Sequence, residues 1–384
     1  MSTVVTPELE AQTIAWRRHL HANPELSFEE HETTRFVEDA LVEMGGLEIE
    51  RPTETGVVAR LRGARPGRTL ALRADIDALP ITEETGLDFA STRPGAMHAC
   101  GHDGHTAMLL AAAKVLVQRR QELSGEVRFM FQPAEEHPPG GARVLVEAGV
   151  MDGVDLVVGA HLFSTVNVGK VAVPVGPVTA AADIWDAEVQ GKGGHAAMPH
   201  KAVDPIVVAS EVVLAFQQLV SRSVDPMKSA VVSVTRFEGG SAHNIIPEAV
   251  KLAGTVRTFD AEVRAGVQAG MGRVLRGVTE AHGAGYSFQY LEGYDPVLND
   301  PDAAELVRAA VLAELGEDVL VDYPPIMAGE DFSAYLSCAP GVFFIVGAGE
   351  TGGIPHHHPR FTIDESAFRN GIAVFVRTAL DYLA

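Results

Sequence analysis

The stretch Met97–Thr106, which reads MHACGHDGHT, decides how the rest of the chain is interpreted. It brings imidazoles, a thiol and a carboxylate into a few neighbouring positions. Such side chains bind transition metals, whereas an apolar core is destabilised by them. The stretch therefore predicts a metal site, with a polar turn of coincidental histidines as the alternative. The side chains concerned are His98, Cys100, His102, Asp103 and His105.

Composition indicates a packed protein of about two domains, because 384 residues exceed one ordinary core. A formal net charge of −21 argues against nucleic acids and anionic membrane surfaces as partners, since like charges repel, but not against small anionic substrates. The charged N-terminal segment has no apolar core of a signal peptide, and no window approaches the ~18 consecutive apolar residues of a membrane span. Cys100 and Cys338 suggest no disulfide framework, so we expect a cytoplasmic protein.

Polar side chains follow several apolar segments that read as strands. Asp75 and Asp77 follow the first, Glu135 and Glu136 the second, and His161 the third. Ligands of open α/β sheets bind at the carboxyl ends of strands, so we expect these groups to meet the cysteine and histidine cluster. The mixture of donors favours zinc, manganese, cobalt or nickel over calcium. The strands are expected at 68–74, 126–131, 154–160 and 341–346, the last before His356, His357 and His358, and the cluster opens a helix over 108–118.

Each group also has an ordinary structural explanation. Asp75 and Asp77 suit a turn as well as they suit a carboxylate that orients a metal-bound imidazole, and paired glutamates are common at exposed helix starts. Adjacent glutamates cannot point the same way, however, so one of Glu135 and Glu136 can bind metal while the other acts as a general base. Coincidence at four strand ends is improbable, and the metal site is the favoured interpretation.

The pattern changes between about 178 and 292. Its order is strand, helix, strand, strand, helix, strand, which predicts a compact α+β insertion of the split βαβ type. The first domain is then discontinuous, over 1–178 and 293–384, with the insertion over 179–292. The expected strands are 183–190, 229–237, 250–260 and 287–292, and the helices are 204–220 and 261–281.

Four further expectations concern single residues and the N-terminal region. Helices are expected from Pro7, capped by Thr6, to before Asn23, and over 29–44. His19, His21 and His31 lack ligand-like neighbours and are expected at the surface or in caps. Cys338 is expected as a small core residue. Glu330 and Asp331 either cap a helix or support the metal site.

Taken together, the motifs resemble one family, the two-metal M20 peptidases, and in particular its amidohydrolase branch. That branch contains hippurate hydrolases, auxin-conjugate hydrolases and N-acyl-amino-acid deacylases. The resemblance covers essentially the whole chain, and many motifs in the right order are more specific than any one of them. Besides MHACGHDGHT they are RRHLHANPELSFEE (17–30), LRADIDALP (72–80), FQPAEE (131–136), GAH (159–161), GKGGHAAMPH (191–200), NIIP (244–247), GTVRTFD (254–260), GEDFS (329–333) and HHPRF (357–361).

The resemblance implies a two-metal site and an α/β catalytic domain, a mixed sheet flanked by helices. Glu135 is the implied general base, and Asp77 is implied to be a carboxylate that orients the metal ligands or has a structural role. The wider family has a metal-ligating histidine where this chain has Asp75, and in the amidohydrolase branch a cysteine takes part instead. The implied ligands are Cys100, His102, Glu136, His161 and His357, and His358 is the alternative to His357.

The resemblance also implies that the insertion is a ferredoxin-like lid and dimerisation domain of a homodimer. His195 is implied to donate to the tetrahedral oxyanion across the dimer interface. Asn244 and Arg257 are implied to hold the substrate's α-carboxylate, for which a guanidinium is well suited. By their residues alone, His195 reads as a turn histidine and Arg257 as a surface strand residue.

The implied activity is metal-assisted hydrolysis of N-acyl amino acids, with an acetyl or aroyl group on the amine, as small-molecule substrates. A dipeptidase or carboxypeptidase on the same scaffold is the alternative. A metal-bound binding protein without catalysis is a remote second alternative, disfavoured because Glu135 is present.

Overall fold

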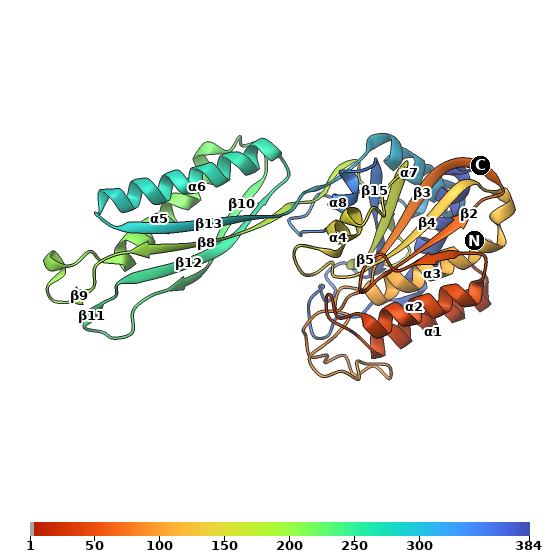
Figure 1. Ribbon diagram of the computed structural model, residues 1–384, viewed down its shortest axis with the longest axis horizontal. Coiled ribbons are helices and arrows are strands. Elements are labelled where there is room, and N and C mark those ends of the chain that lie inside the picture. The colour runs from red at the N-terminus through yellow and green to blue at the C-terminus, as the bar shows by residue number, and fades with distance from the viewer. Residues whose placement is uncertain (1–3) are drawn as a thin grey trace. The chain divides into compact units, whose positions relative to one another are not determined.

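The computed structural model describes residues 4–384, which form two compact units, each drawn in Figure 1. The inserted unit is larger than the expected 179–292. Its last strand runs to Tyr294, and the Ala180 N–H donates to the Ala328 oxygen, which ties a second segment to it. The first unit comprises Met1–Val178, Val297–Pro325 and Asp331–Ala384, and the inserted unit comprises Thr179–Pro296 and Ile326–Glu330.

The first unit is built on a seven-stranded mixed sheet of order β1-β2-β4-β3-β5-β15-β6. The four central strands β4, β3, β5 and β15 are parallel, and the outer strands pair antiparallel. The strands are β1 Glu48–Glu50, β2 Val57–Arg62, β3 Arg65–Asp75, β4 Ser124–Gln132, β5 Leu156–Asn167, β6 Val171–Ala172 and β15 Gly341–Gly349; β7 Gly176–Thr179 pairs separately with β14 Val297–Asn299.

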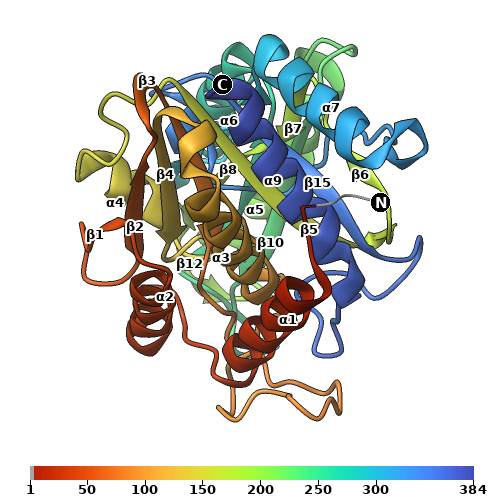
Figure 2. The ribbon, with the colours of Figure 1, turned by 90° about the vertical axis from the view of Figure 1, so that its right-hand side faces the viewer.

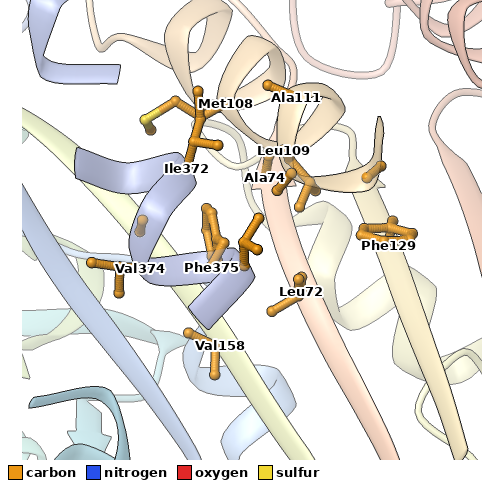
Figure 3. Packing of buried hydrophobic residues seen from close by; sticks show 14 of the residues in the cluster. Leu72, Ala74, Met108, Leu109, Ala111, Phe129, Val158, Ile372, Val374 and Phe375 are labelled. Carbon is orange, nitrogen blue, oxygen red and sulfur yellow. The ribbon is translucent and has the colours of Figure 1, made fainter. Parts of the chain in front are cut away.

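Helices α3 and α9 pack on the sheet and on each other (Figure 2). Figure 3 shows Met108 and Leu109 of α3 facing Phe375 of α9 and Leu72 of β3, all fully or almost fully buried. Burying each such side chain stabilises the fold by roughly 1.5–3 kcal/mol. The helices are α1 Pro7–Ala22, α2 His31–Met44, α3 His102–Gln118, α4 Gly141–Glu147, α7 Pro301–Leu315, α8 Ser333–Leu336 and α9 Phe368–Tyr382, with short 3-10 turns at Arg120–Glu122, Glu317–Val319 and Glu365–Ala367.

The inserted unit is a four-stranded antiparallel sheet of order β10-β12-β8-β13 with α5 and α6 packed on one face. This is the ferredoxin-like arrangement of a split βαβ unit, so the expected fold class is confirmed. Alternate residues of β8 are buried, among them Trp185, because only one sheet face is covered. The elements are β8 Ala181–Gln190, β9 Gly194–His195, α5 Pro205–Gln218, β10 Ala230–Glu238, β11 Ile245–Ile246, β12 Ala249–Thr258, α6 Ala261–Ala281 and β13 Gly285–Tyr294, with a 3-10 turn at Pro199–Lys201 and a π turn at Leu219–Ser223.

Helix α5 is apolar on two sides. Val212 and Phe216 pack in the core beneath the sheet, whereas Val207 and Leu214 are 56% and 68% exposed. Together with its π turn, the segment Pro205–Ser223 is long and apolar enough to cross a membrane by length and composition, a test that core helices of soluble proteins also pass. Its inner side is a sheet-packing surface, and its outer side has no cover within the described residues.

The expectation that His21 lies at the surface is wrong. His21 is fully buried, and its Nδ1 donates to Asp103 Oδ2 at 2.8 Å, while Arg17 Nε donates to the same oxygen at 2.8 Å. Burial disfavours the imidazolium, but the Asp103 carboxylate outweighs it and raises the pKa of His21. Buried charges of this kind persist because they are paired. His19 and His31 are exposed, as expected.

The expectation that Cys338 is a core residue is also wrong. Its side chain is exposed, two residues beyond the end of α8. The Cys338 N–H continues the helical turn by donating to the Tyr335 oxygen, and the Tyr335 side chain, not the thiol, fills the interior.

Candidate active site

The carboxyl ends of β3 and β4 lie level with the middle of β5. Asp75 pairs with Gln132 on β4, and Arg73, two residues earlier, pairs with Gly159 on β5. The expectation that the third strand ends at residue 160 is therefore wrong, because β5 continues past β3, paired with β15, and carries His161 in its interior. The polar side chains still converge at one edge, as the strand-end rule predicts.

The turn before α3 places two donors side by side. Gly101 separates Cys100 from His102 and has a φ of 98°, a left-handed conformation that glycine adopts without strain. Cys100 Sγ lies 3.5 Å from His161 Nε2. The Nδ1 atom of His102 donates to the backbone oxygen of Asp77 at 2.9 Å, which turns its Nε2 toward the same space. That Nε2 is buried and has no hydrogen-bond partner among residues 4–384.

The predicted ligands form two donor sets that share Cys100. One ligand atom from each member lies within 4.8 Å of the others in the set Cys100, His102 and His161, and likewise in the set Cys100, Glu136 and His357. Glu136 Oε1 lies 3.0 Å from His357 Nε2. A donor that belongs to two sets can serve two metal ions, so this arrangement fits a two-metal centre.

The structure distinguishes among the three consecutive histidines. His357 has a φ of 62°, and its N–H donates to the Ala99 oxygen at 2.8 Å, which directs its ring to the donor set. His358 instead accepts the Arg360 N–H at its Nδ1, and His356 donates from Nε2 to the Leu162 oxygen. The geometry therefore favours His357 as the last ligand over the alternative, His358.

The chemistry of the donors fits divalent cations. Burial raises the pKa of the Cys100 thiol well above its usual value, and the carboxylates of Glu136 and Glu135 raise it further. Burial, together with His105 and His356, keeps the pKa of His161 well below its usual value, so that its ring is neutral. Burial opposes the charged form of His102, but the carboxylates of Asp75, Asp77 and Glu136 outweigh it and raise the pKa of His102 to about 10. Carboxylates gathered around a thiol and imidazoles favour positive charge at the site, and a bound cation in turn favours the thiolate and the neutral rings.

Asp77 connects the ligands to the proposed base. Its Oδ1 accepts the Glu135 N–H and its Oδ2 the Glu136 N–H, both at 3.0 Å, and Oδ2 also accepts the Ser27 hydroxyl at 2.7 Å. Burial opposes ionisation, but the hydrogen bonds from His102, Ser27 and Glu136 outweigh it and lower the pKa of Asp77. The carboxylate therefore fixes the backbone of the two glutamates as well as the ring of His102.

Asp75 and His105 lie close to the donor sets but their polar atoms are occupied. Asp75 Oδ1 accepts from His105 Nδ1 at 2.6 Å, and its Oδ2 accepts from Arg73 at 2.7 Å. The Nε2 atom of His105 accepts the Leu162 N–H at 2.9 Å. The one nitrogen lone pair of His105 is therefore engaged, and both oxygens of Asp75 accept hydrogen bonds, although Asp75, His102 and His105 also form a donor group of their own. The sequence interpretation did not assign Arg73 a role, although an arginine inside the apolar run LALRA (70–74) signals a buried ion pair.

Asp331 forms hydrogen bonds with two residues of the site, Glu135 and Arg73. Its N–H donates to Glu135 Oε1 at 3.4 Å, and its carboxylate accepts from Arg73 at 2.8 Å. The same carboxylate accepts the Ala142 N–H in the first turn of α4 at 2.9 Å, so it caps α4 and not the helix that follows it in sequence. Asp331 therefore both caps a helix and supports the site, the two roles that the sequence left open for it.

Comparison with known proteins now bears on the site. A model of the peptidase family M20/M25/M40 matches residues 71–381.

The chain belongs to this family.

Among its relatives, an N-acyl-L-amino acid amidohydrolase of Geobacillus stearothermophilus is 54% identical over 76% of this chain and 79% of that protein. Thermostable carboxypeptidase 2 of Saccharolobus solfataricus is 38% identical over 98% of this chain and 96% of that protein. A Bacillus subtilis crystal structure described as a dinuclear metal-binding peptidase of the M20 family matches with a TM-score of 0.87 and 39% identity over 98% of this chain and 99% of that one.

The inserted unit of this M20 chain carries the other three predicted site residues. His195 and Asn244 lie together, because β9 pairs His195 with Ile245, next to Asn244. His195 is exposed and its Nδ1 accepts the Ala197 N–H at 3.1 Å. Arg257 is half-buried at the opposite end of β12 from β11, and burial lowers its pKa. Their roles in catalysis and substrate binding stay predictions.

Proposed function

We propose that this M20 chain is a metal-dependent amidohydrolase that cleaves the amide bond of N-acyl amino acids, releasing a carboxylic acid and a free amino acid. The observation that carries the proposal is a buried thiol, Cys100, shared by two donor sets with Glu135 beside them. The 54% identity to an N-acyl-L-amino acid amidohydrolase supports this substrate class.

The five donors Cys100, His102, His161, Glu136 and His357 hold two divalent ions in this proposal. Such ions, when bound, lower the pKa of water and polarise a carbonyl group. Glu135 is the group that moves the proton, because its carboxylate lies beside the donors while Asp77 holds its backbone. It takes a proton from the attacking water and returns it to the leaving nitrogen.

The inserted unit contributes substrate recognition. Arg257 and Asn244 hold the α-carboxylate of the substrate, for which the planar guanidinium of arginine supplies two parallel donors. His195 donates to the oxyanion of the tetrahedral intermediate, and removing such a donor typically costs about 100–1000-fold in kcat. The exposure of His195 is consistent with a role that needs another surface to complete it.

Amine release from a panel of N-acetyl amino acids, N-benzoyl amino acids and dipeptides tests the reaction class. We expect turnover of the acyl amino acids in preference to dipeptides, with added manganese, and its loss with a chelator. Faster turnover of dipeptides would favour the peptidase alternative. A protein that carries metal but turns over none of these would favour the binding alternative.

The identity of the metal and the cellular location stay predictions. The mixed sulfur, nitrogen and oxygen donors suit zinc, manganese, cobalt or nickel, and metal analysis of the purified protein distinguishes among them. A cytoplasmic location is favoured because a ligating Cys100 must stay reduced, and localisation of a tagged chain tests it.

The dimer of this proposal forms through the inserted unit, with no nucleic acid or membrane partner. The outer side of α5 exposes Val207 and Leu214, and β10 is the edge strand of its sheet. An exposed apolar patch beside an open strand edge is typical of an interface. A second copy presenting the same patch covers it by twofold symmetry.

Leu214→Glu is expected to convert the dimer into a monomer in sedimentation. Twofold symmetry places the substitution in the interface twice, so the loss is roughly 3 kcal/mol or more, or about a hundredfold in Kd. Leu312→Glu is the matched control, because Leu312 is an exposed helical leucine of the first unit, 40% exposed. A wild-type protein that sediments as a fully active monomer would contradict the dimer.

A further inference from the structure

Three consecutive backbone amides hold the turn after β4. The N–H of Ala134 donates to Glu30 Oε1 at 2.8 Å, and the N–H groups of Glu135 and Glu136 donate to the two oxygens of Asp77 at 3.0 Å each. This turn carries both the proposed base and a proposed ligand. Two buried carboxylates therefore determine where these side chains point.

The residue held by Glu30 has an unusual backbone. Ala134 has a φ of 51°, in the left-handed region that residues with a β-carbon rarely adopt. Glu30 Oε1 also accepts the N–H of Phe28 at 3.0 Å, and Phe28 has a φ of 65°. One fully buried oxygen thus bonds two left-handed residues, one of which immediately precedes Glu135.

The segment around Glu30 also contacts the other turn of the site. Leu26 forms a parallel bridge with Ala78, and the Ser27 hydroxyl donates to Asp77. The connection between α1 and α2 therefore joins the turn after β3 to the turn after β4. Glu30 is absent from every donor set of the described residues, so a ligand role does not account for it.

We propose that Glu30 is a positioning residue for the reaction: by accepting the Ala134 N–H it holds the left-handed turn that aims the Glu135 carboxylate. Glu30 touches neither substrate nor metal in this account and acts only through the backbone at Ala134. The inference rests on the proposed function, since it assigns Glu135 as the base. The motif PELSFEE, whose role the sequence interpretation left open, then serves to shape the catalytic turn.

Glu30→Leu is expected to lower kcat by about 10–100-fold, the range typical of residues that orient catalytic groups from behind, with KM and metal content little changed. Glu30→Gln is expected to stay within about threefold of wild type, because its amide oxygen accepts the same two N–H groups. Hydrogen–deuterium exchange supplies a readout that needs no activity: Glu30→Leu is expected to lose protection at Ala134–Glu136.

Glu25→Leu is the matched control. Glu25 is 7% exposed and accepts the Thr33 N–H at 2.8 Å, yet it bonds no residue of the catalytic turn. We expect Glu25→Leu to leave kcat and the exchange of that turn unchanged, even where it lowers the unfolding temperature.

Ala134→Gly tests the route of the effect, because glycine adopts a positive φ without strain. In the Glu30→Leu background it is expected to recover at least about threefold of kcat, while alone it changes kcat little.

The proposal is overturned if Glu30→Leu keeps wild-type kcat and exchange, or if Glu25→Leu reproduces its losses. It is also overturned if Glu30→Gln loses as much as Glu30→Leu. If the wild type hydrolyses no acyl amino acid, the proposed function fails on its own, and the exchange of Ala134–Glu136 still decides whether Glu30 holds the turn.

Discussion

Replacing Glu135 by glutamine is expected to lower kcat by about 100–10,000-fold, the contribution typical of a positioned general base. The amide cannot take a proton from water, yet it has nearly the shape of the carboxylate. The hydrogen bond to Asp77 comes from the backbone N–H of residue 135, so it survives the change of side chain. We therefore expect both metal content and unfolding temperature to stay close to those of the wild type.

Glu147→Gln is the matched control, because Glu147 is an exposed glutamate of α4 whose one ion pair within the described part of the chain is with Arg143 on the surface. Steady-state kinetics and elemental analysis on the same samples separate the outcomes. A wild-type rate would show that Glu135 is not the base. A low rate with lost metal would make Glu135 a ligand, since it also forms a donor group with His102 and Glu136.

Replacing Cys100 by alanine is expected to remove at least one metal ion per subunit and to lower kcat by more than about 100-fold. Cys100 is the only member common to both three-residue donor sets of the proposed centre among the described residues, so the change leaves two donors in each. Residues that merely orient a ligand cost 10–100-fold when replaced, and a shared ligand is expected to cost more.

Cys338→Ala controls for loss of a thiol as such. Its side chain is exposed and belongs to no donor group among residues 4–384. We expect metal content and rate to match the wild type for this variant. The ligand assignment of Cys100 would fail if Cys100→Ala kept full metal content and a normal rate.

Local signals in the sequence determined most of the architecture. Thr6 before Pro7 began α1 where capping chemistry predicts, with the Thr6 hydroxyl accepting the Leu9 N–H at 3.3 Å. The two-residue alternation of 183–190 predicted a strand covered on one face, which β8 is. Such signals act over one turn or one strand, so the chain displays them without its fold.

Part of the site could also be predicted from the sequence, because residues that follow parallel strands lie at the same end of the sheet whatever their separation in the chain. Cys100, His102, Glu136 and His161 were expected at one sheet edge, and they meet there. The length of β5 could not be predicted from the sequence. The strand continues beyond His161, and only the pairing of His161 with Ile345 of β15 shows this.

The tertiary structure alone decided which polar atoms remain available. By residue type alone His105 could bind a metal as readily as His102, but Asp75 and Leu162 occupy both nitrogens of His105, whereas one nitrogen of His102 has no hydrogen-bond partner among residues 4–384. His21 became a buried ion-pair residue because Asp103, distant in sequence, lies beside it.

The same holds for His357 and Glu30. The resemblance implied His357 as the ligand with His358 as the alternative, and the positive φ and hydrogen bonds of the folded chain favour His357. Glu30 bonds Ala134 across more than a hundred residues of chain. Sequence spacing reports which residues share an element, whereas the hydrogen bonds that direct a lone pair join separate elements, and these exist only in the folded protein.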